Sequence, residues 1–357
     1  MREEQPAYIA GIGMITPVGA NAATTTAAVK AGISGYAVSE FCTREDDSIT
    51  MGLLPENIFY DFDVELDEGA YFSECYDHII KMAHIAAQEA LEGVTMDNPF
   101  PVILGMPEES PGVRFITRES LANNLLKLGA FSTSIDRIQA YSMGRASAIQ
   151  AIASGSRGLS ITNDPYVLIG ASDSYFNFTR VRQLSDAGRL LTENSLDGFA
   201  PGEGAGFILL TTSIEKALVV EQHVVAVHPP GLAEEPGHLH SEDAYKGEGL
   251  HKAFAEALGN APEKSIDSIY SSMNGENFWA KELGVATVRN SRYLKEGYQI
   301  EHPLDCLGDL GAATAPVLIG LAAKDLLFGT QHKNILVYAS SDYSWRAAVR
   351  LEKIQIH

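Results

Sequence analysis

The chain carries the stretch Asp197-Gly-Phe-Ala-Pro-Gly-Glu-Gly-Ala-Gly206, which runs directly into the apolar segment Phe207-Ile-Leu-Leu210. Its glycines permit positive φ and close backbone approach, and Pro201 fixes the turn and removes one backbone donor. The apolar segment is typical of a buried strand. The residues leave two interpretations open: a loop that holds its backbone against a ligand or another loop, or a tight turn before a strand.

The stretch resembles the signature of the β-ketoacyl synthases, a family with the thiolase fold. The resemblance spans nearly the whole chain, most strongly over 160–213 and weakly over 36–135 and 214–270. It implies an α/β protein of two similar βαβαβαββ halves, stacked as an α-β-α-β-α sandwich. Further segments agree with the family in order: 8–19 with its opening strand and turn, Val167-Leu-Ile-Gly-Ala-Ser-Asp173 with the strand after the nucleophile helix, Ala187-Gly-Arg-Leu190 with the segment before the signature, and Leu310-Gly-Ala-Ala313 with its last catalytic helix.

Composition and charge limit the classes of protein to consider. The 357 residues are 45% apolar and 20% charged, which is ordinary for a soluble globular protein with an ample core. We expect a cytoplasmic protein without a membrane span, because the N-terminus lacks an apolar signal core and no run of 18 apolar residues occurs. The three cysteines show no CxxC spacing, which indicates a reducing compartment.

The formal net charge of −20 bears on the partners. Nucleic acids bind clustered Lys and Arg side chains, so we expect no nucleic-acid partner. Acyl carrier proteins, which ketosynthases dock, are themselves acidic. A strongly negative surface would slow that encounter, which makes a carrier protein a less favoured partner.

Short apolar strands alternate with helical patterns, which is typical of an α/β protein. We predict two thiolase-like halves, 1–215 with an insertion near 36–75, and 216–357, although no residue-level repeat is visible. The predicted strands lie near 8–15, 101–105, 137–142, 166–173, 206–212, 223–228, 266–273, 334–341 and 347–354. The predicted helices lie near 22–31, 72–92, 117–128, 144–155, 246–258, 276–283 and 311–327.

A ketosynthase carries a nucleophilic cysteine at a strand-to-helix elbow, where the helix N-terminus lowers the thiol pKa. The matching segment here is 138–149, and its alignment with the family places Ser142 at the cysteine position. A serine needs an adjacent base to become nucleophilic. The alternative, which we favour, is that Ser142 is a helix N-cap.

The resemblance also locates the family's two catalytic histidines. Asn274 matches the first, and asparagine donates a hydrogen bond but shuttles no proton near neutral pH. Gly308 matches the second and offers no side chain. Pro303 replaces the family's lysine, and 341–344 lacks the glycines of the family's acyl gate. We therefore expect ketosynthase condensation to be absent.

Other residues offer alternatives. If His302 reached Ser142, a serine-dependent acyltransferase or thioesterase would result, although a structural role for His302 is the favoured interpretation. Cys306, two residues before Gly308, could also approach the pocket that holds the family's catalytic residues, but it is interpreted as a small buried hydrophobe. Arg145, in the elbow helix, needs a carboxylate if it is buried, and Glu203 is the candidate.

Two motifs invite ligand interpretations. His238 and His240, followed by carboxylates, suggest a metal, but an exposed or interface loop is favoured. Gly11-Ile-Gly13 suggests a dinucleotide, but the next glycine and the acidic residue are misplaced. We therefore expect no metal and no cofactor. The expected substrate contacts are in the signature loop, at Gly202, Glu203 and Gly204.

The sequence thus favours a catalytically degenerate ketosynthase-like protein that works by binding. Some members of the resembled family lack the cysteine and pair with an active sister subunit, where they shape the pocket in which the chain grows. The expected partner is accordingly a second copy, an active ketosynthase or an unrelated client protein. Thiolase-fold proteins typically form dimers through a strand edge, so a partner surface is expected there.

Overall fold

The structure, a computed structural model, describes residues 5–59, 74–95, 98–162, 164–195 and 197–356. Its first half contains β1 (Ala7–Ile15), α1 (Ala22–Lys30), β2 (Tyr36–Cys42), β3 (Ser48–Gly52), α2 (Glu74–Leu91), β4 (Val102–Met106), α3 (Arg118–Lys127), β5 (Ile138–Ser142), α4 (Ser147–Ile161), β6 (Val167–Ser174), α5 (Phe178–Asp186) and β7 (Glu203–Thr211). Its second half contains β8 (His223–Val227), β9 (Gly231–Glu234), α6 (Glu248–Ala257), β10 (Ile266–Tyr270), α7 (Asn277–Arg289), β11 (Leu294–Glu301), α8 (Leu304–Leu307), α9 (Thr314–Phe328), β12 (Asn334–Ser340) and β13 (Trp345–Gln355).

The two halves repeat one strand order. The first has the order β5-β4-β6-β7-β1 and the second β11-β10-β12-β13-β8. The directions also match, because β4 is parallel to β5 and β6, and β10 to β11 and β12, whereas the remaining neighbours in each half are antiparallel. β1 and β8 join the halves through two residue pairs, Ala7 with Val227 and Tyr8 with Ala226. The repeat is therefore visible in topology, although none is visible in the residues.

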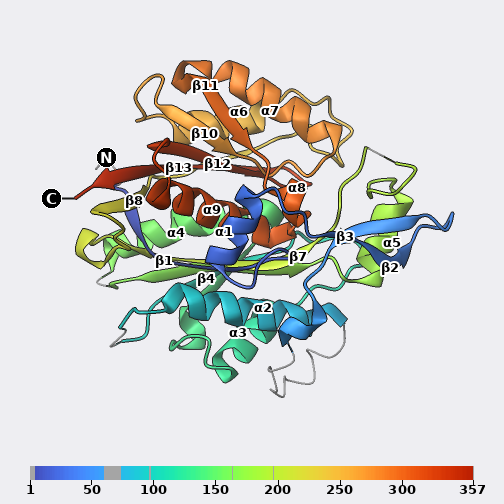
Figure 1. Cartoon of the computed structure of the whole chain (residues 1–357), viewed down its shortest axis with the longest axis horizontal. Coiled ribbons are helices and arrows are strands. Elements are labelled where there is room, and N and C mark those ends of the chain that lie inside the picture. Colours follow the sequence, from blue (N-terminus) through green and yellow to red (C-terminus); the bar gives the residue numbers. More distant parts are fainter. Residues whose placement is uncertain (1–4, 60–73, 96–97, 163, 196, 357) are drawn as a thin grey trace.

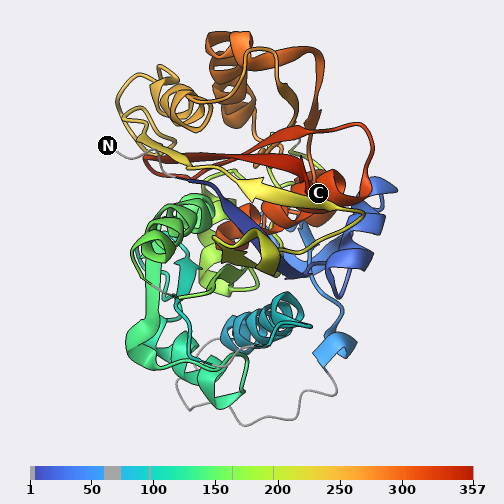
Figure 2. The same ribbon diagram turned by 90° about the vertical axis from the view of Figure 1, so that its left-hand side faces the viewer.

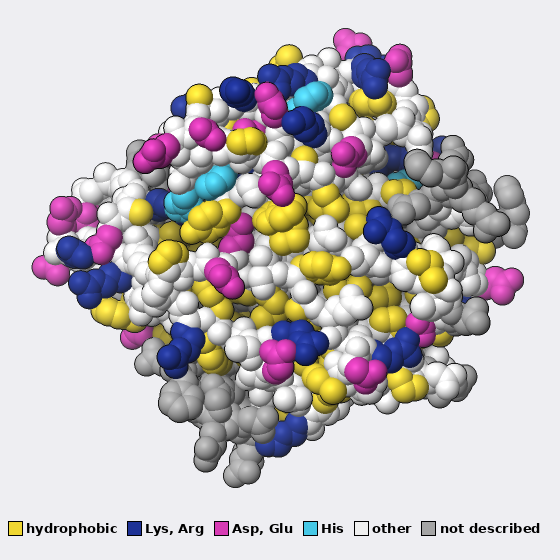
Figure 3. Space-filling view, turned by 180° about the vertical axis from the view of Figure 1, so that it is seen from behind, with side chains coloured by type: hydrophobic (Ala, Val, Ile, Leu, Met, Phe, Trp, Pro, Cys, Tyr) yellow, Lys and Arg dark blue, Asp and Glu magenta, His cyan; other side chains and the backbone are white. Residues whose placement is uncertain are grey.

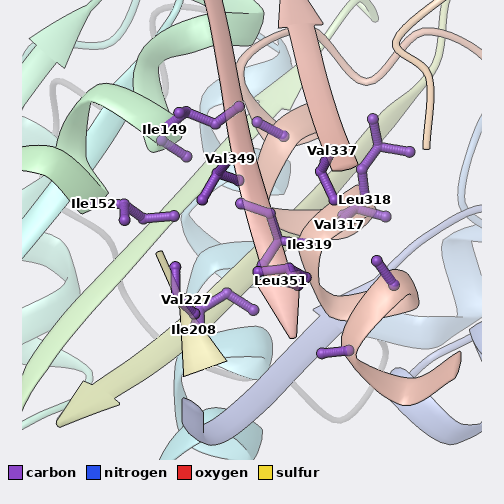
Figure 4. Packing of buried hydrophobic residues seen from close by; sticks show 14 of the residues in the cluster. Ile149, Ile152, Ile208, Val227, Val317, Leu318, Ile319, Val337, Val349 and Leu351 are labelled. Atoms are coloured by element: carbon purple, nitrogen blue, oxygen red, sulfur yellow. The ribbon is translucent and has the colours of Figure 1, made fainter. Parts of the chain in front are cut away.

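Helices and sheets stack in five layers (Figure 1). Helices α2 and α3 cover one outer face, α6 and α7 cover the other, and α4 and α9 lie between the sheets; Figure 2 shows the same layers from the side. The central layer holds the largest apolar cluster, in which Ile149 of α4 and Leu318 of α9 are fully buried. Figure 4 shows these helices against Val337 of β12 and Val349 of β13. This is the thiolase-like architecture that the sequence predicts.

The two glycines of the Gly11-Ile-Gly13 motif in β1 allow α2 to pack closely on this strand. A Cβ on Gly11 would lie 1.9 Å from the Ala90 carbonyl oxygen, and a Cβ on Gly13 would lie 2.0 Å from the Ala86 carbonyl oxygen. Both carbonyls belong to α2, whose backbone lies directly on β1. These glycines therefore admit the helix, and their contacts give no support to the dinucleotide interpretation.

Among the residues that the structure describes, one segment, Gly311–Phe328, is long and apolar enough to cross a membrane, with a mean hydropathy of 1.4. It coincides with α9 and the turn before it, and 83% of it is buried inside the protein. Burial between two sheets accounts for its apolar composition without a membrane.

Every predicted strand and helix has a counterpart, but several elements were missed. These are α5, α8, β9, β11 and the β2–β3 hairpin. The hairpin belongs to the insertion predicted near 36–75, of which residues 60–73 lie outside the described part of the chain. The hairpin packs on the signature segment and on the residues before it, since the Gly52 N–H donates to the Pro201 carbonyl and the Thr50 N–H to the Leu191 carbonyl.

Candidate functional site

The elbow between β5 and α4 forms one wall of the site. Ser142 is the last residue of β5 and is exposed. The positive φ of this turn, 56°, falls at Gly144, after which a short 3-10 turn leads into α4. The N-cap interpretation of Ser142 is wrong, because Ala146 holds the N-cap position of α4 and the Ser147 hydroxyl accepts the Met143 N–H.

The second half contains a matching turn. Gly311 has a φ of 54° and begins a 3-10 turn that leads into α9, as Gly144 does before α4. Gly144 and Gly311 both line a cavity of about 410 Å³. The site therefore lies where the N-terminal ends of the two central helices meet. Its other lining residues are Pro107, Glu108, Glu109, Ser110, Pro111, Phe115, Arg145, Asp173, Tyr175, Arg180, Gln183, Leu184, Ala187, Arg189, His240, Ala312, Asp342 and Tyr343.

Arg145 is the centre of a buried ion-pair network. It is 3% exposed, and its Nε donates to both carboxylate oxygens of Asp309 at 2.9 and 3.1 Å. Its Nη1 donates to Asp342 Oδ1 at 2.7 Å. The expected pairing with Glu203 is therefore wrong. Glu203 instead accepts hydrogen bonds from the Leu54 N–H and the Ser174 hydroxyl, and lies 3.1 Å from Nδ1 of His78.

A second arginine extends the network. Arg189 binds both carboxylate oxygens of Glu276, at 2.7 and 2.8 Å, and donates to Asp342 Oδ2 at 2.6 Å. Asn274 donates to Asp309 Oδ2 at 2.9 Å and to Glu276 Oε2 at 3.2 Å. The position that matches the family's first histidine thus holds an amide that bridges two carboxylates.

The arginines keep the carboxylates of Asp309 and Asp342 charged. Burial alone would raise the pKa of Asp309, but the charge of Arg145 and its hydrogen bonds lower that pKa below its usual value. Burial would likewise raise the pKa of Asp342, but the charges of Arg145 and Arg189 and their hydrogen bonds lower that pKa well below its usual value. Near neutral pH Asp309 and Asp342 are therefore ionised and paired with the arginines.

The segment that matches the family's acyl gate is bonded to the protein along its length. The Ser341 hydroxyl donates to the Met143 carbonyl and accepts from the Ala146 N–H. Arg346 is fully buried and donates to the carbonyls of Ser341 and Tyr343. These hydrogen bonds tie the segment to the elbow and to β13.

The signature loop lies against another loop. The Gly202 N–H donates to the Asp309 carbonyl, and the Asp309 N–H donates to the Ala200 carbonyl. A Cβ on Gly202 would lie 2.9 Å from the Leu307 carbonyl oxygen, and one on Gly204 would lie 2.8 Å from that of Ile15. The interpretation of this stretch as a loop that holds its backbone against a ligand or another loop is therefore right, and the contact is with another loop. The substrate role of Gly202, Glu203 and Gly204 stays a prediction, and none of the three lines the cavity.

Gly308 takes part in the same contact. Its φ is 76°, and a Cβ there would lie 2.9 Å from the Ala200 carbonyl oxygen. The backbone conformation and the close approach both favour glycine. The position that matches the family's second histidine thus serves the backbone turn that presents Asp309.

His302 and Ser142 lie in different places. Ser142 is on the exposed edge strand, whereas His302 lines a separate cavity of about 300 Å³ together with Cys306. Burial raises the pKa of the Cys306 thiol, which makes it less reactive. The geometry therefore offers no support for the serine-dependent acyltransferase or thioesterase.

The two histidines of the proposed metal motif contact an aromatic ring. His238 and His240 lie 5.6 and 4.9 Å from Tyr343, centroid to centroid. Within the described ranges, no three His, Cys, Asp or Glu side chains are arranged to hold a metal ion. His240 borders the cavity, and burial, the largest effect, lowers its pKa.

Most of the charged site residues were missed by sequence reasoning. Asp309, Asp342 and Arg189 stand inside segments that were aligned to the family, and Asp309 directly follows Gly308. A usable signal existed: a buried arginine at 145 requires carboxylates, and these segments supply them. Glu108 and Glu276 carried no comparable signal.

No protein-family model matches the sequence, and no curated protein is significantly similar to it. Solved structures match nearly the whole chain. The ishigamide ketosynthase/chain length factor is 17% identical, with a TM-score of 0.71 over 98% of this chain and 99% of that one. The ketosynthase from module 6 of the bacillaene synthase of Bacillus subtilis 168 is 13% identical, with a TM-score of 0.74 over 98% and 72%.

A third structure, the ketosynthase ApeO in complex with its chain length factor ApeC from Xenorhabdus doucetiae, is 14% identical, with a TM-score of 0.71 over 98% of both chains. The protein therefore has a ketosynthase-like fold. At these identities the likeness defines the fold alone.

Proposed function

We propose that this protein is a non-catalytic, ketosynthase-like subunit that acts by binding a partner. One observation carries the proposal: of the positions aligned with the family's reactive groups, Ser142 is exposed, Gly308 has no side chain, and Asn274 belongs to the buried network of Arg145 and Asp309. Its members neutralise one another, and neither an activated nucleophile nor an imidazole pair is among them. Condensation needs both a nucleophile and polarisation of the carbonyl.

An active ketosynthase is the partner that we favour over a second copy or an unrelated client protein. Two of the similar structures are of a ketosynthase together with a chain length factor. In this chain β5 ends the sheet and presents an open edge, with Gln139 and Ser142 exposed. An open edge offers unpaired backbone groups to another strand. A band of apolar side chains crosses the face shown in Figure 3, where charged groups are scattered around it.

Three further assignments complete the proposal. We divide the chain into halves at 215/216, in the connection between β7 and β8, which the repeated strand order supports. We place the protein in the cytoplasm. The charge of −20 disfavours an acidic acyl carrier protein as its direct partner, although one similar structure holds an acyl carrier protein with its ketosynthase.

The test is co-expression with the ketosynthases of the native host, followed by size-exclusion chromatography with mass determination. We expect a one-to-one complex with one ketosynthase. The double variant Gln139→Asp/Ser142→Asp should abolish it without changing the melting temperature, because both side chains are exposed and carboxylates at the edge disfavour pairing. Asn260→Asp, an exposed site between α6 and β10, is the matched control and should leave the complex intact.

Two results would contradict the proposal. One is a monomer with every ketosynthase of the host. The other is a covalent acyl adduct on the isolated chain after incubation with an activated thioester, abolished by Ser142→Ala, which would establish the serine-dependent enzyme instead.

A further inference from the structure

Glu203, the carboxylate of the signature loop, has hydrogen-bond partners that include no member of the cavity's ion-pair network. Its side chain is 1% exposed, and its Oε1 accepts the Leu54 N–H at 3.0 Å. Its Oε2 accepts the Ser174 hydroxyl at 2.8 Å and lies 3.1 Å from Nδ1 of His78. Among the residues that the structure describes, neither a lysine nor an arginine is ion-paired with this carboxylate. His78 is therefore the group that can supply it with a positive charge.

The imidazole of His78 lies beside two aromatic rings. It is nearly parallel to the ring of Phe176, with the centroids 6.1 Å apart, and its centroid lies 4.9 Å from that of Phe59. Aromatic faces attract cations, so both neighbours are compatible with an imidazolium ion. The His78 side chain is 20% exposed, so it can exchange a proton with solvent.

The contact between His78 and Glu203 joins segments that are far apart in the sequence. His78 belongs to α2 and Glu203 begins β7. Leu54, whose N–H binds the same carboxylate, follows β3 of the hairpin. One buried carboxylate thus attaches both α2 and the segment after the hairpin to the signature loop.

The charged groups that face His78 have opposing effects on its pKa. Burial, the largest effect, lowers this pKa, whereas the hydrogen bond and the charge of Glu203 raise it. On α2 itself, Asp77 raises the pKa and Lys81 lowers it, and these two side chains bind each other at 2.8 Å. The net result is a pKa above the usual value for histidine. Stability that depends on the imidazolium ion is therefore present at low pH and is lost as the pH rises through the pKa of the folded state.

We propose that His78 and Glu203 form a clamp that is operated by a proton: the imidazolium ion neutralises the buried carboxylate and holds α2 and the segment after β3 on the signature loop, and loss of the proton loosens this attachment. The one bond that breaks is an N–H bond of the imidazolium ion, whose proton passes to water. A neutral imidazole can still donate from Nδ1, but it leaves the buried carboxylate without a countercharge. Neither residue lines the cavity or belongs to β5, so the clamp is independent of the proposed partner.

The first test is an NMR titration of the histidine side chains in the whole protein, in which the signal missing from His78→Gln identifies His78. We expect the pKa of His78 to lie above about 6.5, the usual value for histidine. Glu203→Gln keeps an acceptor oxygen but removes the charge. In this variant the pKa of His78 should fall, because burial then acts against weaker opposition.

The second test measures the attachment itself. The ratio of the folding equilibrium constants of the wild type and His78→Gln should fall by more than about twofold between about pH 6 and about pH 8.5. Hydrogen exchange, corrected for the intrinsic effect of pH, should show that the peptide containing Leu54 opens more readily at the higher pH in the wild type but not in His78→Gln.

His228→Gln is the matched control. His228 lies 2.9 Å from Glu352, but this carboxylate also accepts a hydrogen bond from Arg350 at 3.0 Å. Burial, followed by the charge of Arg350, lowers the pKa of His228. The ratio of wild type to His228→Gln should therefore stay level or rise with pH, opposite in sign to that expected for His78.

The proposal is overturned if His78 titrates at or below the usual value for histidine, or if Glu203→Gln leaves its pKa unchanged. It is equally overturned if the ratio of wild type to His78→Gln is the same at both pH values. Should Glu203→Gln fail to fold, the comparison with His78→Gln still decides, because that change removes the titrating group and keeps the carboxylate.

Discussion

At the scale of single residues, the site combines charges that are individually costly to bury. Asp309 is fully buried and is matched by Arg145, by the Asn274 amide and by the Gly311 N–H. The attraction between buried charges offsets their desolvation only when the geometry is good and the remaining hydrogen-bonding groups are satisfied. Such a network stabilises one arrangement of the cavity.

We expect Asp309→Ala to lower the free energy of unfolding by about 3–5 kcal/mol, because Arg145 loses its main partner in a buried place. The double variant Arg145→Met/Asp309→Leu should cost less than the two single changes added together. Urea denaturation monitored by circular dichroism measures both.

The matched control is an exposed pair. Arg44 and Asp186 have side chains that are 67% and 38% exposed, so Asp186→Ala should cost less than about 1 kcal/mol. If Asp309→Ala and Asp186→Ala lowered the free energy of unfolding equally, the buried network would contribute no more to stability than an exposed pair.

At the scale of elements, the close packing of β1 against α2 depends on Gly11 and Gly13. A methyl group on Gly13 would collide with the Ala86 carbonyl, which belongs to rigid helix backbone. The strand and the helix would have to separate, and the apolar surface between them would be exposed to water. Tight packing makes even one added carbon costly.

Gly13→Ala should therefore destabilise the protein by about 1–3 kcal/mol, which thermal and urea unfolding would both detect. Gly158→Ala is the control. Gly158 lies within α4 with nothing within 4 Å of an added Cβ, so the change should be neutral or stabilising by up to about 1 kcal/mol. A neutral Gly13→Ala would refute the close contact.

The elements were predictable from sequence to different degrees. Strands such as β6 and β7, apolar runs beside glycines, were located to within a few residues of their observed bounds. β11 was missed because it carries a largely exposed, polar sequence, and β9 because it is only four residues long. The pairing of Arg145 was missed because Asp309 and Asp342 are distant in sequence, and only the fold brings them together.

At the scale of the whole molecule, the net charge of −20 sets a repulsive background that the buried pairs do not remove. Surface charges interact over a Debye length, which falls from about 30 Å in 0.01 M salt to about 10 Å in 0.1 M salt. Compaction of a highly charged chain costs free energy through self-repulsion.

We expect the free energy of unfolding to rise as sodium chloride increases from about 0.01 to about 0.1 M, since screening relieves this repulsion. Potassium chloride should act equally, which would separate screening from specific ion binding. Differential scanning calorimetry measures the change, and a melting temperature that falls with salt would contradict it.

The ion-pair network also affects how the two halves unfold. Arg145 and Arg189 belong to the first half, whereas Asp309, Glu276 and Asp342 belong to the second. A half released alone would carry an excess of one charge on a freshly uncovered face. Partial opening is therefore penalised, and hydrogen exchange in both halves should report a single cooperative event. A backbone nick in the connection between β7 and β8 should leave the two fragments associated.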